Sequence, residues 1–230
     1  MRNNQVMEKP TLSGSPGLLD VHSIFHTIQG EGPFAGTPAV FIRLAGCNLQ
    51  CPGCDTDYTS GRRTMTVEEI LAKVASVKRP ETTLVVITGG EPFRQLLSGI
   101  VNALLEAFYE VQLETNGTLF QELPYEYITV VCSPKTGSIN GKLARHITAL
   151  KYVLNAVQAD PEDGLPNRAL DNGTSKLARP PEDFVGTIYV QPYDPGGPLR
   201  NDIHHQAAVA SCLRHGYTLC LQMHKFLGLE

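Results

Sequence analysis

The chain has 230 residues, 42% of them hydrophobic, with a formal net charge of −4 and a pI near 6.0. A chain of this length can bury one substantial core, so we expect one domain. The slightly acidic balance argues against nucleic acid or a membrane as a partner, no apolar run reaches the length of a membrane span, and no apolar signal region opens the chain.

The N-terminal part is expected to contain a leader and a turn. Residues 1–19 are rich in glycine and proline and predict a flexible leader, which leaves residues 20–230 as the single domain. Residues 25–32 read Phe-His-Thr-Ile-Gln-Gly-Glu-Gly, and taken alone their polar second half is typical of a hairpin turn.

An apolar strand is expected at residues 38–44, and it contains one charged residue, Arg43. A buried positive charge is costly without a partner, so Arg43 either pairs structurally or faces a ligand. Its position four residues before Cys47 favours the ligand.

Three cysteines follow with the spacing C-x3-C-x2-C, at Cys47, Cys51 and Cys54. Three thiolates in one short loop suit a cuboidal iron–sulfur cluster, which they would hold by three of its four irons. The fourth iron would stay open for a substrate, as catalytic metal sites require. A structural zinc site would need a fourth ligand nearby, and a thioredoxin-like dithiol would leave Cys47 unexplained.

The other three cysteines lie in apolar runs and are expected to be buried small hydrophobes. They are Cys132, Cys212 and Cys220. Six cysteines without an even framework spacing fit a reducing cytoplasm better than secretion. After the cysteine loop, Asp55 and Thr56 are candidates for capping a turn.

Helices and strands alternate in the rest of the chain. A helix at 66–77 opens with the capping box Thr66-Val67-Glu68-Glu69. A strand at 83–88 leads into Thr88-Gly89-Gly90-Glu91-Pro92, where paired glycines let a ligand approach the backbone, although alone the segment could be a turn before a helix. The further expected elements are helices at 93–107 and 199–215 and strands at 109–114, 127–132, 149–154, 187–191 and 217–222.

Alternating strands and helices predict an α/β fold with a parallel sheet covered by helices. The seven expected strands are accompanied by only three clear helices, which is too few helices for a complete eight-fold barrel. Residues 158–185 interrupt the pattern with a polar stretch rich in proline, glycine and aspartate, which predicts a mobile loop or an active-site lid.

The cysteine spacing together with Gly-Gly-Glu-Pro resembles the radical S-adenosylmethionine (SAM) enzymes, and further motifs resemble one subfamily, the 7-carboxy-7-deazaguanine synthases. The resemblance covers the chain apart from the leader and residues 158–185. The motifs that carry it are 25–32, Phe41-Ile42-Arg43-Leu44, Cys54-Asp55-Thr56, Glu114-Thr115-Asn116-Gly117, Ser133-Pro134-Lys135, Gln191-Pro192 and Gln222-Met223-His224-Lys225.

This resemblance implies a fold and an activity. The fold would be an incomplete TIM-type barrel of parallel strands with few covering helices. The enzyme would be a lyase that uses a 4Fe-4S cluster and SAM to convert 6-carboxy-5,6,7,8-tetrahydropterin into 7-carboxy-7-deazaguanine, a ring contraction with loss of ammonia in 7-deazapurine and queuosine biosynthesis. An electron donor such as flavodoxin, a homodimer and a cytoplasmic location are also implied.

The resemblance also implies site residues, with no catalytic residue beyond the cluster and SAM. The cluster would be held by Cys47, Cys51 and Cys54, and a magnesium ion by Thr56, with Asp55 as a second candidate. SAM would contact Gly53, Cys54, Asp55, Gly90, Glu91, Thr115, Ser133, Pro134, Lys135 and Gln191. The substrate would contact Ile28, Gln29, Gly30, Glu31, Arg43, Thr88, His224 and Glu230.

Two other functions stay open at this point. A radical SAM activase that installs a glycyl radical on a partner protein would share the cluster and Gly-Gly-Glu-Pro, but it would need an open groove for a peptide. A metal-binding interaction module built on the three cysteines would bind zinc and be indifferent to SAM. The alternative interpretation of His224 is an ordinary core or surface histidine without a ligand.

Overall fold

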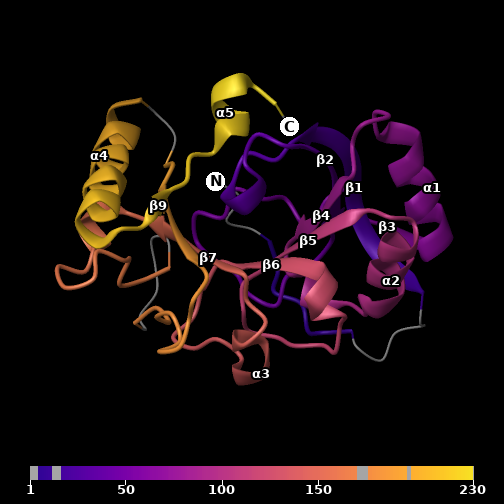
Figure 1. The fold of residues 1–230 in the computed structure, drawn as a ribbon, viewed down its shortest axis with the longest axis horizontal. Helices are drawn as coiled ribbons and strands as arrows, with labels where there is room; N and C mark the ends of the chain where they lie inside the picture. Colours follow the sequence, from indigo (N-terminus) through magenta and orange to yellow (C-terminus); the bar gives the residue numbers. More distant parts are fainter. Residues whose placement is uncertain (1–4, 12–16, 170–175, 196–197, 230) are drawn as a thin grey trace.

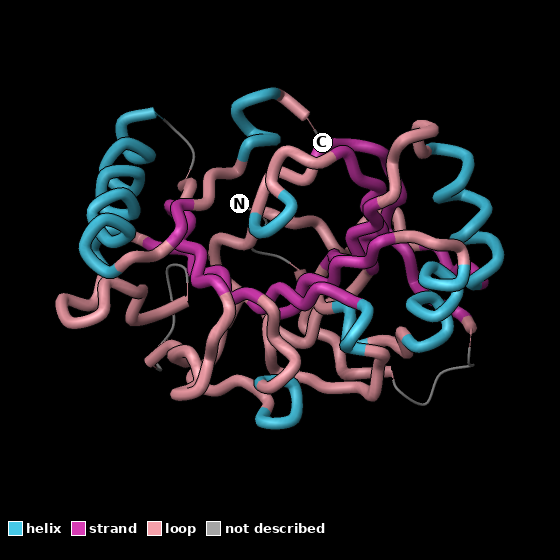
Figure 2. The backbone as a smooth tube through the Cα atoms, in the orientation of Figure 1, coloured by secondary structure: helices cyan, strands magenta, loops and turns pink. Residues whose placement is uncertain are grey.

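A computed structural model describes residues 5–11, 17–169, 176–195 and 198–229 of the chain. The described residues form one nine-stranded sheet in the order β3-β1-β2-β4-β5-β6-β7-β8-β9. Figure 1 shows this sheet as an arc, with α4 outside one end and α1 and α2 outside the other. The strands of Figure 2 do not close into a complete barrel, which confirms the expected incomplete barrel.

The strands and helices have the following bounds. The strands are β1 Leu18–Ile28, β2 Pro38–Leu44, β3 Arg63–Thr66, β4 Leu84–Gly89, β5 Glu110–Thr115, β6 Ile128–Cys132, β7 Ala149–Leu154, β8 Thr187–Pro192 and β9 Thr218–Leu219. The helices are α1 Val67–Val77, α2 Ser98–Glu106, α3 Gly141–Ala144, α4 Pro198–His215 and α5 Met223–Leu227.

All seven expected strands are present, and each pairs in parallel with its neighbour from β2 to β9. The sequence analysis missed β1 and β3, which pair antiparallel at one edge. The ninth strand is also shorter than expected, with only two residues.

The expected helix at 93–107 is divided in two. A 3-10 turn at Pro92–Arg94 is followed by extended backbone at Gln95, and α2 begins only at Ser98. The interruption has a tertiary cause, because Gln121 accepts a hydrogen bond from Leu97 N at 3.0 Å and donates to Phe93 O at 2.9 Å. Helical periodicity alone does not reveal such contacts.

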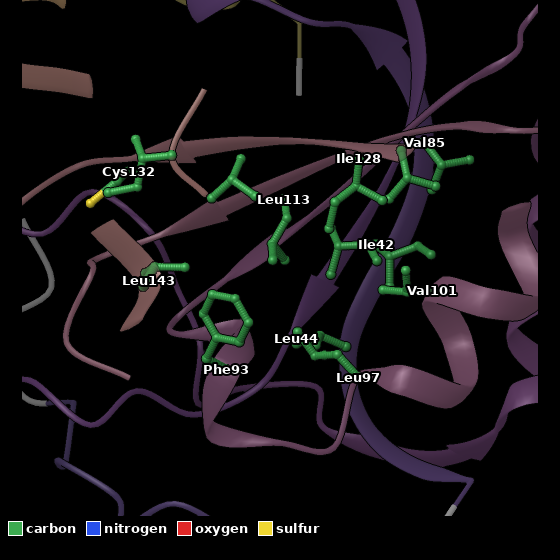
Figure 3. Packing of buried hydrophobic residues seen from close by; sticks show 14 of the residues in the cluster. Ile42, Leu44, Val85, Phe93, Leu97, Val101, Leu113, Ile128, Cys132 and Leu143 are labelled. Carbon is green, nitrogen blue, oxygen red and sulfur yellow. The ribbon is translucent and has the colours of Figure 1, made fainter. Parts of the chain in front are cut away.

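The core lies between the sheet and the helices that cover it. Figure 3 shows Ile42 and Leu44 of β2 in one cluster with Leu97 and Val101 at α2, and all four are fully buried. Burial of one such side chain contributes roughly 1.5–3 kcal/mol. The helix α1 packs in this layer through its buried residues Ile70 and Val74. Its capping box forms as expected, with Thr66 Oγ1 accepting from Glu69 N at 3.2 Å.

Two segments that were expected to be irregular make defined contacts where the structure describes them. The leader over residues 1–19 is structured in part, because β1 begins at Leu18 and residues 5–11 contact the cysteine loop; residues 1–4 and 12–16 lie outside the described part. In the 158–185 segment, Leu165 and Leu177 are buried and Arg179 Nε donates to Asp163 Oδ2 at 2.6 Å. Residues 170–175 of that segment lie outside the described part.

No helix among the described residues combines the length and apolar character of a membrane span.

Candidate active site

The candidate site is a cavity of about 320 Å³ beside the carboxyl ends of the parallel strands. In open α/β sheets this edge is where ligands bind. Most of the residues expected to bind a ligand line this cavity. They are Ile28, Gln29, Gly30, Glu31, Arg43, Cys47, Cys51, Gly53, Cys54, Asp55, Thr56, Thr88, Gly90, Thr115, Ser133, Lys135, Gln191 and His224.

The three cysteines enter the cavity from one loop between β2 and β3. All three are free thiols. Gly46 N donates to Tyr58 O at 2.7 Å and closes the base of this loop. Asn48 connects the loop to the segment after β5, where its Nδ2 donates to Thr118 Oγ1 at 2.8 Å.

The Gly-Gly-Glu-Pro segment supports the cysteine loop through close backbone packing. A Cβ atom at Gly90 would lie 2.1 Å from Gly46 O and 2.9 Å from Cys47 Cβ, so a side chain cannot fit there without moving the loop. The expectation was that glycine here admits a ligand; the structure adds that it admits the cysteine loop itself.

The donor set and its surroundings fit an iron–sulfur cluster. Burial raises the pKa of the Cys47 thiol to about 12 and also raises the pKa of Cys51 and Cys54. The metal-free thiols are therefore protonated at neutral pH, and a metal must displace their protons. Among the described residues no three His, Cys, Asp or Glu side chains converge on one point. A cuboidal cluster does not require this, because each thiolate binds a different iron.

A buried ion pair between Glu31 and Lys151 lies at another part of the cavity. Gln222 Nε2 also donates to Glu31 Oε1, at 2.8 Å. Burial alone would raise the pKa of Glu31, but the Lys151 ammonium outweighs it and the pKa lies below its usual value. Lys151 was missed in the sequence, although a lysine within the apolar strand β7 carries the same signal that identified Arg43.

Glu114 is a second carboxylate that the sequence analysis left without a role. It accepts hydrogen bonds from Gln29 Nε2 at 3.1 Å, from Thr88 Oγ1 at 2.9 Å and from Gln112 Nε2 at 2.9 Å. Gln29 and Thr88 were both expected at the substrate, so Glu114 is the group that orients them. Its place in Glu-Thr-Asn-Gly, at the end of β5, was the available signal.

Arg43 lies beside this polar group with a donor to spare. Its guanidinium carbon is 5.2 Å from the centre of the Phe25 ring. Its buried Nε has no hydrogen-bond partner among the described residues. An unsatisfied charged donor next to a cavity favours a ligand over a structural ion pair.

Residues 29–37 are a hairpin connection, and the first three of them also line the cavity. They join the antiparallel strands β1 and β2, and Gln29 N donates to Thr37 O at 2.8 Å. The predicted hairpin turn and the predicted ligand contacts are therefore compatible. A Cβ atom at Gly30 would lie 2.5 Å from His224 Nδ1, so glycine is what lets α5 dock here.

The helix α5 brings residues from near the end of the chain to the cysteine loop. Gln222 Nε2 and Lys225 Nζ donate to Asp55 Oδ2 at 3.2 and 3.1 Å. Burial opposes this charge, but Lys225 and Gln222 outweigh it and hold the pKa of Asp55 at about 2. Burial also lowers the pKa of His224 below its ordinary value, which favours the neutral imidazole. Neither Gln222 nor Lys225 was expected at the site.

Asp55 and Thr56 do not cap the turn that follows them. Asp57 does so, because its Oδ1 accepts from Thr59 N at 3.0 Å and Ser60 N at 3.1 Å. Thr56 Oγ1 instead lies 3.4 Å from Asp55 Oδ1. Two hard oxygen atoms therefore lie side by side at the cavity wall.

Two expected contact residues that the structure describes do not line the cavity, and a third lies outside the described residues. Glu91 is fully buried, and its carboxylate accepts from Asn116 N at 2.6 Å and Thr115 Oγ1 at 2.8 Å, so it connects the ends of β4 and β5. Burial raises the pKa of Glu91 to about 7. Pro134 lies outside the lining. Glu230 lies outside the described residues.

Comparison with known proteins places this cavity in context. A family model described as the Radical SAM superfamily matches residues 41–139. The 7-carboxy-7-deazaguanine synthase of Rhodospirillum rubrum is 44% identical, covering 96% of this chain and 97% of its own length. The same enzyme of Rickettsia prowazekii is 39% identical, covering 97% and 94%. The crystal structure of QueE from Escherichia coli has a TM-score of 0.69 and 24% identity over 89% of this chain and 93% of its own, a likeness of fold.

Proposed function

Because the chain belongs to the 7-carboxy-7-deazaguanine synthase family, we propose that its cavity holds a 4Fe-4S cluster, SAM and 6-carboxy-5,6,7,8-tetrahydropterin together. The chain is a radical SAM lyase of 7-deazapurine biosynthesis, and its product is 7-carboxy-7-deazaguanine. The observation that carries the proposal is the single cavity lined by three free cysteines and by the polar set around Glu31 and Glu114.

Cys47, Cys51 and Cys54 would hold the cluster and leave one iron for SAM. When bound, the cluster and SAM supply a one-electron reduction that generates a reactive carbon radical. The electron would come from a donor such as flavodoxin. Lys135 supports this arrangement from the buried side of the cavity, because its ammonium lies close enough to Cys51 to counteract the effect of burial on that thiol's pKa.

SAM would take the part of the cavity near the cysteines. The residues proposed to contact it there are Gly53, Cys54, Asp55, Gly90, Thr115, Ser133, Lys135 and Gln191. Lys135 Nζ donates to Ser133 O at 3.1 Å, so these two neighbours are already fixed relative to each other. A fixed frame suits a reaction that needs the reacting carbon close to its target.

The pterin would be held by the polar groups at the other part of the cavity. The Glu31–Lys151 pair and the Gln29–Glu114 pair present acceptors and donors that match the lactam and guanidine-like edge of a pterin. Arg43 would bind the substrate carboxylate, because its unpaired Nε and planar guanidinium suit such a partner. These groups hold and orient the substrate and exclude water from it.

Magnesium would bind at Thr56, with Asp55 beside it. The two oxygen atoms, 3.4 Å apart, belong to the ligand class that Mg²⁺ prefers. A cation here would balance the substrate carboxylate. The hydrogen bonds from Gln222 and Lys225 to Asp55 Oδ2 leave Oδ1 turned toward Thr56.

Assembly and location complete the proposal. The homodimer is supported by apolar side chains that are exposed on α4 and α5, among them Leu213 and Phe226. The cytoplasmic location is supported by six free thiols. The glycyl-radical activase is not favoured, because the relatives from Rhodospirillum rubrum and Rickettsia prowazekii, which match nearly the whole chain, carry the synthase name.

The test separates the two parts of the cavity. Glu31→Gln should lower pterin turnover about thirtyfold or more, because one partner of a buried charge pair is lost. Reductive SAM cleavage without pterin should stay near the parent rate, since Glu31 lies with the pterin. Cys51→Ala is the control and should abolish both. Equal loss of both reactions in Glu31→Gln would contradict the proposed division.

A further inference from the structure

Residues 5–11 run along the base of the cysteine loop, and Gln5 is their most buried side chain, with 5% of its surface exposed. Its amide uses both of its polar ends on the backbone of that loop. Gln5 Nε2 donates to Thr56 O at 2.7 Å, and Gln5 Oε1 accepts from Tyr58 N at 2.7 Å. An amide with this donor and acceptor pair recognises one arrangement of the two residues.

The same segment also contacts the other end of the loop. Glu8 N donates to Cys47 O at 2.7 Å. The Glu8 carboxylate forms ion pairs with Arg62 and, at 3.4 Å, with Arg94. Residues 5–11 therefore bind the loop on both sides of the three-cysteine motif, at Cys47 and at Thr56 and Tyr58.

Arg94 is a buried side chain that connects residues 5–11 to the start of the cysteine loop. It is 2% exposed, and its Nη2 donates to Ala45 O at 3.2 Å while its Nη1 donates to Lys9 O at 3.2 Å. A Cβ atom at Gly46 would lie 2.5 Å from Arg94 Nε, so the guanidinium packs directly under the residue before Cys47. One buried arginine thus joins the N-terminal segment to the start of the cysteine loop.

The loop depends on such outside contacts, because it has little structure of its own. No helix or strand is present between Leu44 and Arg63 in this fully described stretch. Its inner bonds include Gly46 N to Tyr58 O and a long contact from Cys54 N to Cys51 O at 3.3 Å. A loop with so few backbone–backbone hydrogen bonds of its own opens easily unless side chains and neighbouring segments hold it.

We propose that residues 5–11 form a clasp that holds the cysteine loop in the conformation that binds the cluster, with Gln5 as its positioning residue. The inference rests on the proposed function only in that the loop binds iron. Gln5 does not line the cavity. It acts by fixing Thr56 and Tyr58 on the far side of Cys54, while Glu8 N of the same segment holds the chain at Cys47.

The experiment measures release of iron from the anaerobically reconstituted full chain to a coloured chelator. Gln5→Ala should release iron about tenfold faster than the parent, because two buried hydrogen bonds are lost. Gln5→Glu has the same shape but cannot donate to Thr56 O. It should therefore release iron at least as fast as Gln5→Ala. Met7→Ala is the matched control, since Met7 is exposed in the same segment, and should equal the parent. Thermal melts verify that each variant is folded.

The outcomes separate the clasp from simpler explanations. Equal release from all four proteins would overturn it, and a Gln5→Glu protein that behaves like the parent would show that Gln5 only fills space. Alkylation of Cys51 and Cys54 in the cluster-free proteins gives a second measurement, in which both Gln5 variants should react faster. If the parent bound no four-iron cluster, the proposed function would fail, while alkylation would still decide on the clasp.

Discussion

Two basic residues within apolar strands, Arg43 in β2 and Lys151 in β7, face one cavity but have different surroundings. Lys151 is paired with Glu31, whereas Arg43 Nε has no partner among the described residues. The paired lysine keeps a carboxylate ionised and in place. Arg43 Nε is left as a donor for a ligand, and the two roles together suit the substrate proposed above, which has both a polar edge and a carboxylate.

Removing one member of the Glu31–Lys151 pair should destabilise the fold more than removing both. Glu31→Gln leaves a buried ammonium without its counter-charge and should cost about 3 kcal/mol, whereas the double variant with Lys151→Met should recover most of that loss. Urea unfolding of the parent, Glu31→Gln and the double variant measures this. A double variant less stable than Glu31→Gln would contradict it.

The same pair predicts a dependence of stability on pH. The folded pKa of Glu31 lies below its ordinary value of 4.5, so its contribution is complete above pH 4.5 and is lost as the pH falls through the folded pKa. The double variant lacks this titration, and its unfolding free energy should fall less steeply below pH 4.5.

Thr56 should reveal its role through magnesium. Thr56→Val removes one hard oxygen and should raise the magnesium concentration for half-maximal rate about tenfold, whereas Thr56→Ser should resemble the parent. Cluster content should be equal in all three, since Thr56 supplies no thiolate. Identical curves of rate against magnesium concentration for the parent, Thr56→Ser and Thr56→Val would show that Thr56 does not bind the metal.

At the scale of elements, α5 shows how a five-residue helix completes a site formed by strands. Met223 N donates to Gly30 O at 3.2 Å, which docks α5 on the β1–β2 connection. In Figure 1, α5 lies at the open side of the arc of strands. The docking brings His224 and Lys225 to the cavity, although they follow Gly30 by about 190 residues in the sequence.

Gly30→Ala should disturb this docking specifically. The added Cβ would meet His224 Nδ1 at 2.5 Å and His224 N at 3.0 Å, so the helix must move. Turnover should fall about tenfold to a hundredfold, because a displacement near 1 Å is enough to misplace substrate groups. Iron content should stay at the parent level, and the two are measured on one preparation. Unchanged turnover would show that the position of α5 is not critical.

The elements also show what the sequence can predict. Apolar runs identified all seven parallel strands, because the central ones, such as β4, are buried on both faces and almost continuously hydrophobic, whereas both residues of β9 are exposed. The strand β1, which lies between the edge strand β3 and β2, was missed because polar residues interrupt its apolar pattern. Lys225 and Gln222 were missed because their role depends on Asp55, a contact that only the folded chain brings together. Arg43 was predicted because its charge contradicts its local pattern.

At the scale of the whole molecule, the open sheet explains how one small chain serves several ligands. The carboxyl ends of the parallel strands and the loops that follow them surround one cavity, as the incomplete arc in Figure 2 allows. The cysteine loop enters from the β2 side, and the Lys151 pair enters from β7. Cluster, SAM and pterin would therefore meet without any movement of domains.

The most direct test is anaerobic incubation of the reconstituted protein with SAM, a reductant, magnesium and 6-carboxytetrahydropterin, followed by mass analysis of the products. The predicted result is 7-carboxy-7-deazaguanine together with ammonia, formed by the parent and absent with Cys51→Ala. Cleavage of SAM that leaves the pterin unchanged, or pterin conversion that persists in Cys51→Ala, would contradict the account.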